Sequence, residues 1–67
     1  MREVRERIRP VVDLLEYKIR GGEISNGGGH KILGVLLEKP DLVDTIMNIL
    51  DLELDEEETL AQVERLK

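Results

Sequence analysis

The sequence contains no cysteine, and Tyr17 is the only aromatic residue among its 67 residues. The absence of cysteine excludes disulfides and thiolate metal ligands, and it fits a protein of a reducing compartment. A single histidine with scattered carboxylates is also a poor set of ligands for structural zinc. Without Phe and Trp, the side chains that usually dominate cores and interface hot spots are missing. Any core must therefore be aliphatic, and we expect no metal and no cofactor.

Long hydrophobic runs are missing as well. No stretch reaches 18 consecutive apolar residues, and the arginine-rich first nine residues do not lead into the apolar segment of a signal peptide. We therefore expect a cytoplasmic protein that does not enter a membrane. Leu, Ile and Val, by contrast, are abundant and make up 23 of the 67 residues. This content is too apolar for a disordered chain and predicts one folded domain spanning residues 1–67.

A chain of this length lies near the lower limit at which one hydrophobic core sustains a fold. Because neither a disulfide nor a metal can add stability here, we expect the chain to form a homo-oligomer or to bind another protein. The charge is also uneven: residues 1–31 carry a net charge of +2 and residues 32–67 a net charge of −7. Such polarity permits the chain to pack its own ends against each other, or two copies to pair head to tail.

The spacing of the apolar residues predicts an all-α fold, a small bundle of three to four short helices that is completed by oligomerisation. We expect helices at about 2–20, 30–38, 40–51 and 56–66, with a glycine-rich joint at 21–29. The first helix follows from apolar residues at i, i+4 and i+7 starting from Val4. The fourth follows from Asp55 and Glu58, whose spacing matches a capping box. Residues 32–37 have no polar face, so the spacing of their apolar residues does not distinguish a helix from a strand. The length of the segment favours a helix only slightly.

The sequence GGGHK at residues 27–31 is the one segment with a catalytic or binding character. Backbone N–H groups at a helix N-terminus, with cationic side chains beside them, can hold an anion or a phosphate. The candidate anion-binding residues are Gly28, Gly29, His30 and Lys31. The glycines also fit a structural role, in which they let the second helix fold back on the first, and we favour that role.

Residues 27–34 resemble the substrate-phosphate loop in the accessory domain of DHH-type phosphoesterases. The resemblance implies phosphate contact by Gly28, Gly29 and His30 without hydrolysis. The small residues that the family has after the histidine are Ile and Leu here, and Gly34 comes one position early. The aspartate-rich metal domain of that family cannot fit in this chain, which is therefore not assigned to it.

The sequence lacks the residue patterns that other kinds of catalytic, metal-binding or nucleic-acid-binding site require. No lysine follows a glycine run with P-loop spacing, and His30 is the only base that could activate a hydroxyl nucleophile. The acidic residues 51–58 lack the spacing and the central glycine of a calcium loop. The helix predicted at 40–51 contains no Lys or Arg, which disfavours nucleic acid as a partner. We expect no enzymatic activity.

The leading hypothesis is an acidic helical protein–protein interaction or regulatory module that self-associates through its aliphatic stripe. The predicted interface residues are Val4, Ile8, Val11, Leu15, Ile19, Leu42, Ile46 and Ile49. One alternative is an acidic inhibitor that mimics a polyanion through Glu56, Glu57 and Glu58. The other is an anion-binding or phosphate-binding protein that uses residues 27–31.

Overall fold

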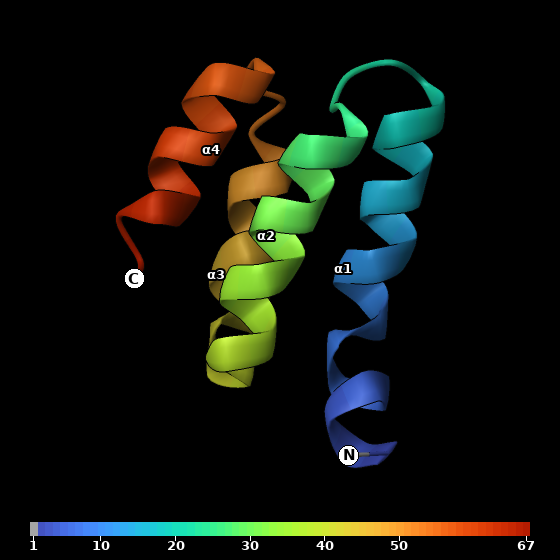
Figure 1. Cartoon of the computed structure of the whole chain (residues 1–67), viewed down its shortest axis with the longest axis vertical. Coiled ribbons are helices and arrows are strands. Elements are labelled where there is room, and N and C mark those ends of the chain that lie inside the picture. The colour runs from blue at the N-terminus through green and yellow to red at the C-terminus, as the bar shows by residue number, and fades with distance from the viewer. Residues whose placement is uncertain (1) are drawn as a thin grey trace.

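The computed structural model describes the backbone of residues 2–67 and the side chains of residues 5–67. The described chain is all-helical, as predicted, and Figure 1 shows its four α-helices. The elements are α1 (Arg2–Arg20), α2 (Asn26–Glu38), the 3-10 helix η1 (Pro40–Leu42), α3 (Val43–Asp51) and α4 (Glu56–Glu64). No strand occurs in the described backbone, so the segment 32–37 is helical.

Helices α2 and α3 form the middle of the bundle. Both α1 and α4 pack against these two helices, and η1 contacts α1, α2 and α3. Figure 1 shows α1 and α4 on opposite sides of the α2–α3 pair, with α3 behind α2. Helix α2 therefore has α1 along one side and α4 along the other.

The core lies where the four helices meet, and it is aliphatic as the composition predicted. The buried apolar residues are Ile8, Val11, Leu15, Ile24, Ile32, Val35, Leu36, Ile46, Ile49, Leu50 and Val63. In α1, α2 and α3 these positions follow the 3.6-residue period, so each of these helices presents an apolar stripe to the others, and α4 contributes Val63. The only aromatic side chain, Tyr17, is 72% exposed and makes no part of the core.

Helix α1 ends in a Schellman motif. Gly22 has a φ of 77°, in the left-handed region that favours glycine. The N–H of Glu23 donates to the carbonyl of Lys18 at 2.9 Å, and the N–H of Gly22 donates to the carbonyl of Ile19 at 3.1 Å. This pair of bonds satisfies the last carbonyls of the helix. The chain then turns, and Ile24 enters the core.

Helix α2 begins at Asn26, four residues earlier than predicted, so the predicted joint at 21–29 is wrong over 26–29. Each glycine lowers the stability of a helix by up to about 1 kcal/mol relative to alanine, and for this reason the glycine run was predicted to be a loop. The helix nevertheless begins before the glycines because the Ser25 side chain caps it, accepting a hydrogen bond from the N–H of Gly28 at 3.1 Å. The loop between α1 and α2 is residues 21–25.

The second half of the chain follows the sequence pattern closely. Pro40 opens a 3-10 turn before α3 starts at Val43, where the sequence predicted one continuous helix. Asp55 caps α4 by accepting a hydrogen bond from the N–H of Glu58 at 2.8 Å, which confirms the predicted cap. Helix α4 ends at Glu64, two residues before the predicted end.

Candidate functional site

The N-terminal end of α2 contacts the carboxylate of Glu56, the first residue of α4. The backbone N–H of Ser25 donates to Glu56 Oε1 at 3.0 Å, and the Ser25 hydroxyl donates to Glu56 Oε2 at 2.6 Å. A helix N-terminus stabilises negative charge because its first N–H groups have no partner within the helix. The segment for which the sequence offered anion binding as an alternative therefore holds a carboxylate of the same chain.

Two of the glycines in α2 allow close packing. A Cβ atom on Gly28 would lie 2.5 Å from Glu56 Oε2 and 3.3 Å from Ile24 Cγ2. A Cβ atom on Gly29 would lie 2.8 Å from Ile19 Cδ1. Both glycines are buried. They let α4 and α1 approach α2 closely. The structural role favoured from the sequence was a different one, a turn that folds the second helix back on the first, whereas these glycines lie inside α2.

His30 and Lys31, the other two candidate anion-binding residues, lie on different sides of α2. His30 lines a groove between α1 and α2, whereas Lys31 lines a groove between α2 and α4. Both side chains are exposed. The four candidate residues therefore do not converge on one point, and an external anion at Gly28 would have to displace Glu56.

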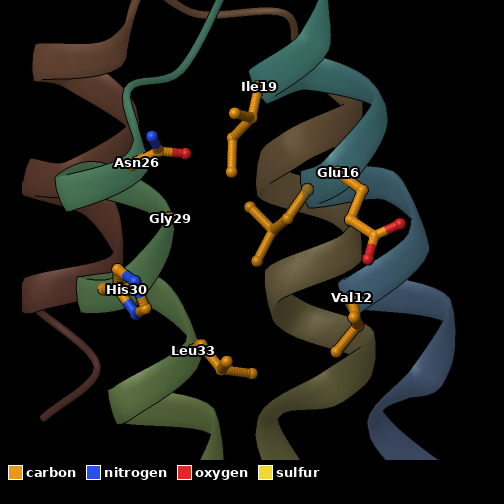
Figure 2. Close-up of a pocket in the computed structure, with 8 residues that line it drawn as sticks. Val12, Glu16, Ile19, Asn26, Gly29, His30 and Leu33 are labelled. Carbon is orange, nitrogen blue, oxygen red and sulfur yellow. The ribbon is translucent and has the colours of Figure 1, made fainter.

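The groove between α1 and α2, here called the α1–α2 groove, is a surface hollow lined by residues of both helices. It has a volume of about 190 Å³. Its lining residues are Val12, Leu15, Glu16, Ile19, Asn26, Gly29, His30 and Leu33. Figure 2 shows Val12 and Ile19 on α1 and Leu33 on α2 directed into the space between the helices, with Glu16 and His30 nearer its edges. The groove therefore combines an aliphatic interior with a few polar groups.

The apolar surface continues past the groove. Leu37 follows Leu33 by four residues on α2, so it lies on the same side of the helix one turn further along. Its exposed fraction is 53%, whereas Leu33 is half-buried. Val12, Ile19 and Leu33 pack against the core from outside and remain partly accessible. Together these four side chains form an aliphatic strip along α1 and α2.

Most of the predicted interface residues lie inside the chain's own core. Ile8, Val11, Leu15, Ile46 and Ile49 are buried, and Ile19 and Leu42 are partly buried against them. The side chain of Val4 lies outside the described residues. The stripe that was predicted to complete a core with another chain thus packs against helices of the same chain. Of these residues, Leu15 and Ile19 line the α1–α2 groove.

The sequence analysis named Ile19 as an interface residue but did not separate Val12, Glu16 and Ile19 as a second stripe on α1, and it missed the contact between Ser25 and Glu56. Val12, Glu16 and Ile19 follow one another at i, i+4 and i+7, a signal that was present beside the stronger buried stripe. Ser25 precedes the glycines at the spacing of an N-cap, and that signal could have placed the start of α2. Nothing in the sequence indicated that Glu56 would reach Ser25, because the two residues are 31 positions apart.

The groove between α2 and α4 is more polar. It has a volume of about 280 Å³ and is lined by Lys31, Gly34, Val35, Glu38, Glu64 and Lys67. Beside it, Lys39 Nζ donates to the backbone carbonyl oxygen of Lys67 at 2.7 Å, and Lys67 Nζ lies 3.4 Å from Glu64 Oε2. The charged groups of Lys39, Lys67 and Glu64 therefore already contact one another or the backbone of this chain.

Among the described residues, no group of three or more His, Cys, Asp or Glu side chains gathers in a way that could hold a metal ion. In the same part of the chain, no helix has both the length and the hydropathy needed to span a bilayer. Comparisons with protein-family models, with curated proteins and with solved structures find no match for this chain.

Proposed function

We propose that this chain is a helical protein–protein interaction module that associates with a second copy of itself through the α1–α2 groove. The observation that supports the proposal is an open aliphatic groove on a chain whose core is already filled by its own helices. Burial of apolar surface favours association by about 25 cal/mol per Å². The strip formed by Val12, Ile19, Leu33 and Leu37 is the apolar surface that remains for this purpose.

The proposed interface is aliphatic, and this limits its strength. Hot spots of tight interfaces are enriched in Trp, Tyr and Arg, and no aromatic residue lines the groove. We therefore expect a dissociation constant on the order of micromolar, which corresponds to about −8 kcal/mol. An association of this strength suits a regulatory contact that forms and dissociates with concentration.

Replacing Leu37 with Glu should weaken self-association at least tenfold. The change places a charge on the apolar strip, where it would lose hydration in the contact. Because Leu37 is 53% exposed in the single chain, the fold should tolerate it. The measurement is sedimentation equilibrium over a dilution series, with circular dichroism at 222 nm to check that helicity is unchanged.

Leu52→Glu is the matched control for this experiment. Leu52 is 63% exposed and follows α3, away from the α1–α2 groove. The variant Leu52→Glu should self-associate with the same dissociation constant as the natural chain. The proposal is wrong if the natural chain is monomeric up to millimolar concentration, or if Leu37→Glu and Leu52→Glu weaken association equally.

A second proposal, that the chain is an acidic mimic of a polyanion, is favoured by the exposure of its acidic side chains. The side chains of Asp51, Glu53, Glu57 and Glu58 are all exposed around the junction of α3 and α4. Glu56 is not part of this surface because it is bonded to Ser25. The remaining carboxylates could occupy a basic groove on a partner, since desolvated opposite charges attract across an interface.

The acidic surface can be tested with the variant Glu53→Gln/Glu57→Gln/Glu58→Gln and an oligolysine probe. We expect the variant to bind oligolysine at least tenfold more weakly at low salt, with NMR shifts in the natural chain confined to residues 51–58. Self-association should not change. Equal binding by the natural chain and the variant would contradict this second proposal.

A further inference from the structure

Helix α4 contributes less to the buried core than the other three helices. Val63 is its one member of the buried apolar set in the described chain, whereas α1, α2 and α3 each supply three residues. The other buried side chain of α4 is that of Thr59, which is polar. Between α2 and α4 the polar groove of about 280 Å³ is open, with Val35 in its wall. The apolar contact that holds α4 is therefore small, and separating α4 from α2 and α3 exposes little apolar surface.

Polar contacts hold α4 at both of its ends. Glu56 at its start accepts hydrogen bonds from the backbone N–H and the hydroxyl of Ser25 at 3.0 and 2.6 Å. Beyond its other end, Lys39 Nζ donates to the backbone carbonyl oxygens of Leu66 and Lys67 at 3.4 and 2.7 Å. Ser25 and Lys39 are exposed. Water can therefore replace both end contacts, because folding exchanges such hydrogen bonds with those to solvent.

The backbone is strained where α3 joins α4. Glu53 has a φ of 55°, the single positive φ of a non-glycine residue in the described backbone. The left-handed region places Cβ too close to the following carbonyl oxygen. The conformation turns the chain at the end of α3, where the N–H of Glu53 donates to the carbonyl of Leu50 at 3.3 Å. Strain in a link between two helices favours a state in which the link relaxes.

We propose that α4 is a strap that opens as a unit, with residues 52–55 as its hinge, while α1, α2 and α3 stay folded. Opening breaks both end contacts, relaxes Glu53 and uncovers the part of α2 that carries Val35. Figure 1 shows α4 on the side of the α2–α3 pair away from α1, so α4 can leave without displacing α1. The closed strap therefore conceals apolar surface that is separate from the α1–α2 groove. This inference concerns a single copy of the chain and does not depend on the proposed function.

Native-state hydrogen exchange measured by NMR, at a concentration where the chain is monomeric, tests the opening. We expect the backbone N–H groups of residues 60–64 to share one protection factor, at least about tenfold below those of Ile32, Leu36 and Ile49. Fraying of α4 from its end would instead give protection that falls steadily from residue 60 to residue 64. That gradient would overturn the strap, and so would equal protection in α4 and in the other helices.

Two variants separate the opening of α4 from unfolding of the whole chain. Ile8→Val lies in α1, whose core contacts persist in the open state. It should speed exchange about fivefold in α1, α2 and α3 and leave residues 60–64 unchanged. Glu56→Ala removes a contact that both opening and unfolding break, so it should speed exchange about thirtyfold and alike at residues 60–64. If Ile8→Val speeds exchange in α4 as well, α4 unfolds only with the rest of the chain and the strap is wrong.

Glu53→Gly tests the hinge, with Glu53→Ala as its matched control. Both variants remove the same carboxylate, but only glycine adopts a φ of 55° without strain. Glu53→Gly should therefore slow exchange at residues 60–64 about threefold relative to Glu53→Ala, because it stabilises the closed strap. Slower exchange confined to the other three helices, or no difference between the two variants, would overturn the hinge at residues 52–55.

Discussion

Glu56→Ala should lower the free energy of unfolding by about 2 kcal/mol. The substitution removes the carboxylate that accepts hydrogen bonds from the backbone N–H and the hydroxyl of Ser25. Hydrogen bonds to a charged group contribute about 1.5–3 kcal/mol when buried, and partial exposure of both residues reduces the sum. The measurement is urea denaturation followed by circular dichroism.

Glu57→Ala is the matched control for this prediction. Glu57 is the next residue of α4, so its replacement removes the same charge from the first turn of the helix and makes the same change in helix propensity. It is exposed, and we expect its effect to stay within about 0.5 kcal/mol. Equal losses for the two variants would show that Glu56 acts through the helix dipole of α4 and not through Ser25.

The same variant examines whether α2 binds anions. In Glu56→Ala the backbone N–H and the hydroxyl of Ser25, the N-cap of α2, lose the carboxylate to which they donate. If that end of the helix has affinity for anions, phosphate should stabilise Glu56→Ala more than the natural chain. The residues involved would be those predicted from the sequence, with Gly28 at the centre and the natural occupant removed.

Gly28→Ala should have opposite effects in the natural chain and in Glu56→Ala. In the natural chain the added Cβ would lie 2.5 Å from Glu56 Oε2, so the carboxylate must leave Ser25. Alanine gains up to about 1 kcal/mol in helix propensity, and we expect a net loss of about 1 kcal/mol. In Glu56→Ala the clash with the carboxylate is gone and the contact with Ile24 Cγ2 at 3.3 Å remains, so the same change should stabilise by only about 0.5 kcal/mol. The two sites are thus coupled by about 1.5 kcal/mol in a double-mutant cycle.

Gly34→Ala controls for helix propensity in the same helix. Gly34 is exposed, and no heavy atom lies within 4 Å of a Cβ built on it. It should stabilise by about 0.7 kcal/mol in either background. If Gly28→Ala behaves as Gly34→Ala does in the natural chain, the close approach of Glu56 does not contribute to stability.

The contact between Ser25 and Glu56 also affects the proposed interaction surface. It holds the first turn of α2, which contributes Asn26 and Gly29 to the α1–α2 groove. Helix α4, which lies on the side of α2 opposite the groove, therefore holds in place the end of the groove that Asn26 and Gly29 line. This groove is the surface where a second copy is proposed to bind. Glu56→Ala should weaken self-association as well as the fold, whereas Leu37→Glu should weaken only self-association.

Part of the candidate site was predictable. The glycine run was identified as the segment with special chemistry, and a structural role as a turn was favoured over binding, whereas the structure shows Gly28 and Gly29 in close packing inside α2. The groove was not identified, because Val12 and Ile19 lie beside a longer and more apolar stripe, and Leu33 and Leu37 lie in a segment without a polar face. The most apolar stripe of the first helix was predicted to form an interface with another chain. A chain that folds by itself first buries such a stripe in its own core, and this is where Ile8, Val11 and Leu15 lie.

The sequence by itself determined the helices and the aliphatic core. These depend on local patterns: the spacing of Ile8, Val11 and Leu15, and the cap that Asp55 provides to α4. The tertiary structure alone decided which residues stayed outside the core and which anion reached the start of α2. Both depend on contacts between residues far apart in the chain, such as Ser25 with Glu56. Such contacts follow from how the helices pack, and no local pattern encodes them.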